Sequence, residues 1–265
     1  MFTLNNLVQP ETIDEAYKIL VEKRNNTVLG GCCFLRMGAK RIGTALELSK
    51  LNLNYIREDN EYIEIGAYTT FRDLETSPLL NEYFNGIIPK AIAHIIGVQF
   101  RSVVTVGASV FSKYGFSDLL PSLVVLNCEV DLYHVGRMSL SELLQKPYEK
   151  DILTRIFLKK NNKKAVYINF RNAKSDFSIL NAAVSLLDNE FCIAVGARPM
   201  GAKIAAKASD YISKNKLTEA AIEEAAVLAS NELAFGSNMR ASGEYRKALC
   251  NVLVKKALKE VSGCR

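Results

Sequence analysis

The sequence of 265 residues lacks the signatures of several common enzyme classes. It contains no G-x-S-x-G segment, no glycine-rich loop ending in lysine and no G-x-G-x-x-G motif. The usual motifs of serine hydrolases, phosphate-loop nucleotide hydrolases and Rossmann dinucleotide-binding proteins are therefore missing. Only two histidines occur, and the apolar helical stretch around His94 and the turn beside His134 favour structural roles over acid–base catalysis.

The cysteines show no metal-binding spacing. Six are present, and no two of them form a C-x-x-C pair: Cys32, Cys33, Cys128, Cys192, Cys250 and Cys264. Neither an iron–sulfur or zinc centre nor a disulfide framework is predicted, so we expect reduced thiols. Adjacent cysteines seldom reach disulfide geometry without strain, which favours Cys32 and Cys33 as small residues filling a turn over a redox pair.

Long apolar runs are also lacking. None approaches the roughly 20 residues needed to span a bilayer, and the first residues show no signal-peptide pattern. With 49% hydrophobic and 23% charged residues, we expect a soluble, cytoplasmic globular protein without a membrane span. The net charge of +6 is spread out, and its one basic cluster surrounds Asn161 and Asn162. Without interleaved aromatic residues, this cluster predicts a hairpin tip and no nucleic-acid site.

Two apolar segments break into glycine-containing turns. Residues 28–35 read VLGGCCFL, and residues 105–109 read TVGAS, with Ser117 and Asp118 following downstream. The backbone N–H groups of such a turn can bind an anion, and a nearby carboxylate can bind hydroxyls of the same ligand. Each turn alone is more often just a tight connection, but two phosphate-sized turns suggest a dinucleotide.

Hydrophobic periodicity predicts mixed helix and sheet. A capping box of Thr12 and Glu15 begins the first helix, which ends at Asn25 and Asn26. Further helices are expected after Thr70 and over 86–97, 118–126, 139–144, 201–213, 218–233 and 242–260, with Thr218 and Ser242 as N-caps. Strands are expected over 27–29, 45–48, 62–65, 129–133, 152–157, 165–170, 177–186 and 190–195.

These elements predict an α+β fold in three domains. Residues 1–57 would form a small α/β lobe, and residues 58–150 a larger α/β lobe that clasps the dinucleotide with it. Residues 151–265 would form a domain in which the last four strands make an antiparallel sheet, because their connections are short, followed by a helical bundle.

Several stretches resemble the FAD-binding medium subunit of the molybdenum hydroxylases, the family of xanthine dehydrogenase and aerobic carbon monoxide dehydrogenase. They run in family order over nearly the whole chain: Gly30–Gly31, 65–70, 99–102, 105–118 and 238–246. The resemblance implies a PCMH-type FAD-binding domain. It further implies partner chains, namely a [2Fe–2S] small subunit and a molybdopterin-binding large subunit. Electrons would pass from the molybdenum site through the clusters to FAD and on to NAD or another acceptor.

The resemblance also implies the positions that bind the cofactor. Backbone N–H groups of the first turn would hold one side of the FAD diphosphate, the second turn would approach the other, serine hydroxyls would add contacts, and Asp118 would bind the ribityl chain. The implied FAD-binding residues are Leu29, Gly30, Gly31, Cys32, Cys33, Phe34, Thr105, Gly107, Ala108, Ser109, Ser112, Ser117 and Asp118. Asp118 also suits the N-cap of the helix that follows it, and both roles are compatible.

The chain departs from the family pattern at a few of these positions. Cys32 and Cys33 replace a threonine and a polar or acidic residue, Ala108 and Ser109 replace a glycine and an asparagine, and Asn169 replaces a frequent lysine. An alanine at a position that needs positive φ would be strained. Two alternatives to the electron-transfer subunit therefore stay open: a flavin-free scaffold subunit of the same complex, and a self-sufficient FAD oxidoreductase.

Overall fold

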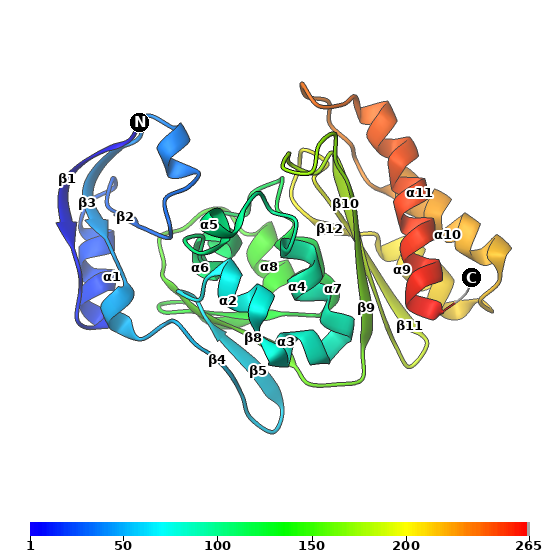
Figure 1. Ribbon diagram of the computed structural model, residues 1–265, viewed down its shortest axis with the longest axis horizontal. Helices are drawn as coiled ribbons and strands as arrows, with labels where there is room; N and C mark the ends of the chain where they lie inside the picture. The colour runs from blue at the N-terminus through cyan, green and yellow to red at the C-terminus, as the bar shows by residue number, and fades with distance from the viewer. Residues whose placement is uncertain (264–265) are drawn as a thin grey trace. The chain divides into compact units, whose positions relative to one another are not determined.

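The computed structural model describes residues 1–263, which pack as two units interleaved along the chain (Figure 1). Unit 1 comprises Met1–Leu74, Gly97–Ser112 and Cys128–Lys159. Unit 2 comprises Glu75–Ile96, Lys113–Asn127 and the chain from Lys160 onward. Each unit has its own sheet or sheets and its own buried residues, so each is described by itself.

The first sheet of unit 1 is parallel and small. Its strands are ordered β1-β3-β2, with β1 at Thr3–Val8, β2 at Thr27–Val28 and β3 at Arg41–Leu46. Helix α1 (Ile13–Glu22) buries Ala16 and Leu20 against Leu46 and Leu48. The predicted cap is confirmed, because the Thr12 hydroxyl accepts a hydrogen bond from the Glu15 N–H at 3.2 Å.

The second sheet of unit 1 is antiparallel and has five strands in the order β4-β5-β8-β6-β7. These strands are β4 (Ile56–Glu58), β5 (Tyr62–Gly66), β6 (Glu129–Leu132), β7 (Gly136–Ser139) and β8 (Leu153–Lys159). The short helices of unit 1 are η1 (Leu35–Met37), between β2 and β3, η2 (Ser49–Leu51), between β3 and β4, α5 (Val98–Arg101), α6 (Val106–Phe111) and α8 (Leu140–Gln145). The division between the two units falls within α2 (Phe71–Thr76).

Unit 2 is a four-stranded antiparallel sheet with helices on both faces (Figure 1). Its strands are ordered β12-β11-β10-β9, with β9 at Lys164–Phe170, β10 at Leu180–Leu187, β11 at Glu190–Gly196 and β12 at Lys203–Ile204. The helices α9 (Ala206–Lys214), α10 (Glu219–Glu232) and α11 (Gly243–Ser262) pack on one face, and α7 (Leu119–Val125) packs against the same strands. The remaining helices are α3 (Pro78–Glu82), η3 (Tyr83–Gly86) and α4 (Ile87–Ile92).

Side-chain alternation explains how this sheet is covered. Successive residues of a strand point to opposite faces. Val166, Ala182 and Val184 accordingly join the buried cluster with α9, α10 and α11. Asn181 and Ser185 of the same strand point to the opposite face. The Asn181 amide donates to the Ser117 carbonyl just before α7, and the Ser185 hydroxyl donates to the Val125 carbonyl at its end. All seven residues of α7 are buried, as expected for a helix that is apolar all round.

The strand expected over 152–157 was assigned to the wrong sheet. β8 pairs with β5 and β6 in unit 1, and the C-terminal sheet takes the short strand β12 as its fourth member. The basic cluster is therefore not a hairpin tip, because it connects strands of two different sheets. Within it, Lys163 is buried and its Nζ donates to the Val125 carbonyl oxygen at 3.3 Å. The sequence reading also missed β1.

Within residues 1–263, no helix has both the length and the apolar composition that a membrane-spanning segment requires. Five cysteines in this range are free, and Cys264 lies outside the described residues.

Candidate functional site

The first glycine turn is an open loop in unit 1 that follows β2. The Leu29 N–H donates to the Leu46 carbonyl at 2.8 Å, which ties the start of the loop to β3. Gly31 and Cys32 then adopt the left-handed conformation, with φ of 76° and 57°. Among residues 1–263, the backbone N–H groups of Gly31, Cys32 and Cys33 have no acceptor. Three consecutive unpaired donors form a cradle that fits an anion such as a diphosphate.

The loop lies directly against the segment that carries the second turn. A Cβ added to Gly30 would lie 2.3 Å from the Ala108 Cβ and 2.7 Å from the Thr105 Oγ1. A Cβ added to Gly31 would lie 1.9 Å from the Val103 carbonyl oxygen. Both glycines are therefore required by close backbone approach, and the structure brings the two predicted turns together.

The second turn is the beginning of α6. The Thr105 hydroxyl accepts from the Ala108 N–H at 3.3 Å and caps the helix. The Gly107 N–H donates to the Ala67 carbonyl at 2.7 Å, and the Ser109 N–H donates to the Thr105 carbonyl at 3.1 Å. The backbone donors of Gly107, Ala108 and Ser109 are thus used within the protein and are not free to bind a ligand.

Ala108 is not strained. It lies inside α6 and is absent from the residues with positive φ, so the conformation that would disfavour alanine does not occur there. The expectation that alanine costs stability at this position was wrong. The reason is that the turn continues directly into a right-handed helix, which alanine favours.

Polar and sulfur side chains surround the first loop. Cys32 and Cys33 are half-buried, and burial raises the pKa of both thiols. Burial, followed by a hydrogen bond to the Glu47 carboxylate, raises the pKa of the Tyr68 hydroxyl. These groups are neutral at physiological pH, so they add no negative charge against a bound phosphate. Phe34 is 42% exposed and Ser112 is exposed.

Asp118 lies in unit 2 at the start of α7, where it is 6% exposed. It makes no side-chain bond to the helix N-terminus. The Ser117 hydroxyl accepts from the Leu120 N–H at 3.2 Å instead, so the capping role belongs to Ser117. Asp118 thus occupies the N-cap position of α7, but the prediction that its side chain caps the helix was wrong.

The Asp118 carboxylate is held by four protein donors. Its Oδ1 accepts from Tyr167 Oη at 2.5 Å, Ser178 Oγ at 2.6 Å and Asn181 Nδ2 at 3.1 Å, and its Oδ2 accepts from Arg171 Nη2 at 2.7 Å. Burial and the neighbouring Asp118 charge raise the pKa of Tyr167 well above its usual value, so this hydroxyl stays a donor. The Asp118 carboxylate and the Arg171 guanidinium therefore form a buried ion pair, and the hydroxyl and amide groups hold the carboxylate in position.

The sequence reading missed these four partners. They lie 49 to 63 residues away from Asp118 in the sequence. No pattern in the residues near Asp118 can indicate hydrogen-bond partners at that distance. Alternation along 165–170 does place Tyr167 on one face of a strand, which is the only hint the sequence offers.

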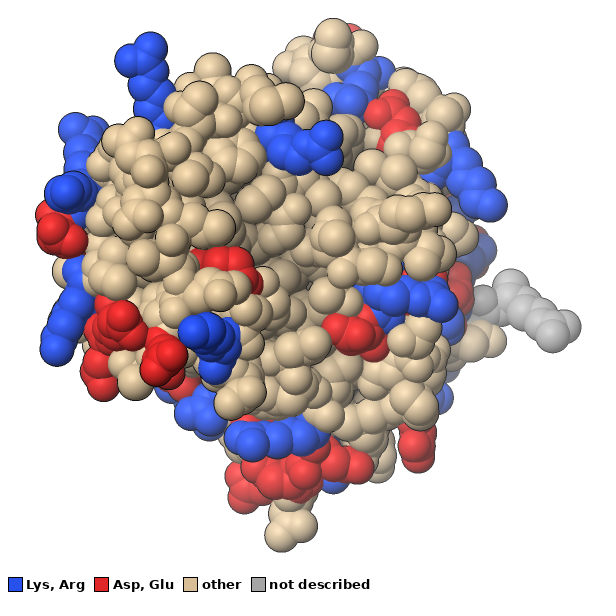
Figure 2. All heavy atoms as spheres, turned by 60° about the vertical axis from the view of Figure 1, so that its left-hand side comes forward, with Lys and Arg blue, Asp and Glu red and all other residues tan. Residues whose placement is uncertain are grey.

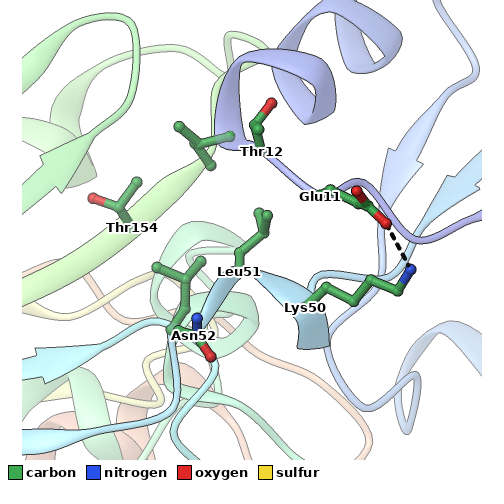
Figure 3. A pocket seen from close by; sticks show the side chains of 8 residues that line it. Glu11, Thr12, Lys50, Leu51, Asn52 and Thr154 are labelled. Atoms are coloured by element: carbon green, nitrogen blue, oxygen red, sulfur yellow. Dashed lines mark hydrogen bonds and ion pairs between the residues drawn. The ribbon is translucent and has the colours of Figure 1, made fainter.

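Two other features do not belong to this site. A pocket of about 270 Å³ in unit 1 is lined mainly by residues 11–13 and 50–53, and its rim carries the Lys50–Glu11 ion pair (Figure 3). It shares no residue with the two turns. On the face in Figure 2, Lys and Arg side chains are interspersed with Asp and Glu side chains, so that face has no broad patch of one charge.

Comparison with known proteins defines the family. Residues 2–160 match the model of the FAD binding domain in molybdopterin dehydrogenase, and residues 165–261 match that of the CO dehydrogenase flavoprotein C-terminal domain. The chain therefore belongs to the FAD-binding family of the molybdopterin dehydrogenases. This confirms the predicted family, with FAD as its cofactor and an oxidoreductase role.

Curated relatives match almost end to end. The medium subunit of nicotine 6-hydroxylase from Paenarthrobacter nicotinovorans is 23% identical over 95% of both chains. The medium chain of glyceraldehyde dehydrogenase from Sulfolobus acidocaldarius is 26% identical over 96% of this chain and 97% of its own.

Solved structures show the same fold. Reconstituted CO dehydrogenase from Oligotropha carboxidovorans superposes with a TM-score of 0.90 at 20% identity, covering 99% of both chains. Quinoline 2-oxidoreductase from Pseudomonas putida 86 gives 0.87 at 19% identity, covering 99% of this chain and 98% of its own. The predicted α+β class is confirmed.

Proposed function

We propose that this chain is the FAD-binding subunit of a molybdenum hydroxylase, and that it passes electrons from [2Fe–2S] clusters in a partner subunit through FAD to NAD or another acceptor. The observation that carries the proposal is the loop at residues 30–33, whose three unpaired N–H groups lie against the second turn in a chain of the FAD-binding family. The near-complete overlap with two medium subunits supports a role in a larger complex.

FAD would supply the redox chemistry, and the protein would bind and orient it. The N–H groups of Gly31, Cys32 and Cys33 would hold the diphosphate. Gly30 and Gly107 would allow the backbone segments to approach closely, since a Cβ at Gly107 would lie 2.8 Å from Ala67. Leu29 and Phe34 would flank the diphosphate, Thr105 and Ala108 would shape the turn beneath it, and the hydroxyls of Ser109, Ser112 and Ser117 would add polar contacts.

One set of observations favours the flavin-free scaffold as the second candidate. The N–H groups of Gly107 to Ser109 are consumed within the protein, and Asp118 already accepts four hydrogen bonds. A scaffold would keep the fold and the partner surfaces without the cofactor.

Titration of the purified protein with FAD and with FMN separates these candidates. We expect FAD to bind more tightly, because FMN lacks the diphosphate that the cradle fits. Equal affinity for both flavins would contradict the diphosphate assignment, and binding of neither would favour the scaffold.

Purification of the protein from its native host tests the partners. We expect an iron–sulfur chain and a molybdopterin-binding chain to copurify. A monomer that carries flavin and oxidises a donor by itself would instead establish a self-sufficient oxidoreductase.

A further inference from the structure

Three connecting segments of unit 2 lie at one end of its sheet. Antiparallel pairing places the end of β9, the start of β10 and the end of β11 side by side. Figure 1 shows the segments on this side of the unit: residues 171–178, 197–202 and 234–242. Two contacts join them, because the Gly236 N–H donates to the Arg198 carbonyl at 2.6 Å and the Arg240 Nε donates to the Asp176 carboxylate at 3.1 Å. We call this surface the loop end of unit 2.

A turn at residues 238–241 is fixed in place by hydrogen bonds. The Asn238 N–H donates to the Ala241 carbonyl at 3.1 Å, and the Asn238 side chain accepts from the Arg240 N–H at 3.0 Å. Arg246, which is 1% exposed, donates to the Ala241 carbonyl at 2.7 Å and to Asn238 Oδ1 at 2.6 Å. Its Nε donates to the Ile179 carbonyl at 2.9 Å, which ties the turn to the start of β10. Any movement that covers the tip of the turn would break these bonds.

The tip of this turn is an apolar side chain in solvent. Met239 is 94% exposed, although methionine is a residue type that proteins usually bury. Further exposed apolar side chains lie close by in the fold: Met200 on the second segment, and Phe170 and Tyr245, whose ring centroids are 6.4 Å apart. Methionine and aromatic residues are enriched at protein interfaces, where a few anchors supply much of the affinity. A fixed turn that presents a methionine therefore suits insertion into an apolar pocket of another protein.

The loop end also carries an excess of positive charge. In the three segments and residues 243–247, six basic residues occur with two acidic ones: Arg171, Lys174, Arg198, Arg240, Arg246 and Lys247, with Asp176 and Glu244. Arg171 and Arg240 each pair with an aspartate. Arg198 and Arg246 are buried, yet within residues 1–263 they donate to carbonyl and amide oxygens and to no carboxylate. Such oxygens hold a guanidinium group but leave its charge uncompensated, so a surface that covers this end should carry carboxylates.

We propose that the loop end of unit 2 binds a partner protein whose contact surface has an apolar pocket for Met239 and carboxylates that face the surrounding basic residues. The inference rests on the proposed function, because it takes this partner to be one of the chains that assemble with the subunit. The docking site lies wholly within unit 2. A second copy of this chain is a poorer fit, since two loop ends face to face would bring like charges together.

Methionine oxidation tests the docking site on the natural complex. The complex purified from the native host and the chain expressed alone are each treated with a low dose of hydrogen peroxide, and mass spectrometry follows each methionine. In the chain alone, Met239 should be oxidised much faster than Met138, which is buried. In the complex, oxidation of Met239 should slow by about 10-fold or more, because oxidation depends on exposure.

Variants of the full-length chain test the chemistry of the partner. Association with the copurified chains is measured for Met239→Glu, for Met239→Lys and for the matched control Val227→Glu, which places the same charge at an exposed apolar position of α10. Met239→Glu should weaken association about 30-fold, as loss of an interface anchor does. Met239→Lys should weaken it less, because the partner is acidic, and Val227→Glu should leave it unchanged. The affinity of the wild type should fall as ionic strength rises.

Several outcomes would overturn this proposal. Equal oxidation of Met239 in the complex and in the chain alone would do so, as would normal association of Met239→Glu. Equal losses for Met239→Glu and Met239→Lys would exclude an acidic partner. Protection of Met239 in the chain alone at high concentration would assign the surface to a second copy. If the wild-type protein copurifies with no other chain, the proposed complex itself is overturned, and the docking site with it.

Discussion

Replacing Gly31 with alanine should damage both the fold and FAD binding. Gly31 has a φ of 76°, and a Cβ there would lie 1.9 Å from the Val103 carbonyl oxygen and 2.6 Å from the Val103 carbonyl carbon. Real Cβ contacts essentially never fall below 3.0 Å, and the obstructing atoms belong to the backbone, so one chain segment must move by about 1 Å. That movement would pull the first loop away from the second turn.

The expected loss of stability has two parts. The left-handed conformation costs alanine about 1–2 kcal/mol, and displacement of packed backbone adds a similar amount, about 3 kcal/mol together. For a chain of this size, each kcal/mol lowers the melting temperature by about 2–4 °C, so Gly31→Ala should lower it by about 6–12 °C.

Gly136→Ala provides a matched control for this experiment. Gly136 also has a positive φ, 88°, but a Cβ there would meet nothing within 4 Å. Its substitution carries only the conformational cost of about 1–2 kcal/mol, so the melting temperature should fall by about 2–8 °C, less than for Gly31→Ala, and FAD affinity should be unchanged. Equal losses for the two variants, or normal FAD affinity in folded Gly31→Ala, would refute the steric reasoning.

Three further predictions follow from the surroundings of the site. Ala108→Gly should lower stability by about 0.5–1 kcal/mol in thermal denaturation, because glycine is unfavourable inside a helix, and a higher melting temperature would contradict this. At pH 8, iodoacetamide should modify Cys32 and Cys33 before Cys192, whose pKa burial raises to about 11, and FAD should slow modification only at the adjacent pair, as read by mass spectrometry. Tyr167→Phe should lower stability at pH 7 by about 1–2 kcal/mol. Since burial raises the pKa of Tyr167, its contribution is fully present below about pH 10 and is lost above it, so the difference from wild type in chemical denaturation should narrow there.

Local signals made most of the helices predictable. Thr12, Thr218 and Ser242 each accept the expected N-terminal hydrogen bond, at 3.1 to 3.2 Å. These caps depend on residues three positions apart, which a sequence displays directly. The partner of a strand is not displayed in this way. The pattern of β8 identifies a strand, but its pairing with β5 joins residues about 90 or more positions apart, from Gly66 with Arg155 to Tyr62 with Lys159.

The candidate site also combines features that depend on neighbouring residues with features that depend on residues far apart in the sequence. The glycine turns and Asp118 could be predicted as site residues because each is part of a short motif. The partners of Asp118 were not, because Tyr167 and Arg171 reach it only through the path of β9, 49 and 53 residues later. The internal use of the N–H groups of Gly107 to Ser109 was also hidden, since it depends on the approach of Ala67 and on the beginning of a helix at Thr105.

The interleaving of the two units affects how the chain folds during synthesis and which truncated fragments can fold. The chain passes between the units five times, after Leu74, Ile96, Ser112, Asn127 and Lys159. On the ribosome, the five-stranded sheet cannot close until β8 has emerged, and α7 must wait longer for β9, β10 and β11. A fragment cut after residue 160, at the end of the FAD-binding family match, would expose the fully buried α7. Such a fragment should aggregate, so cofactor binding must be studied on the intact chain.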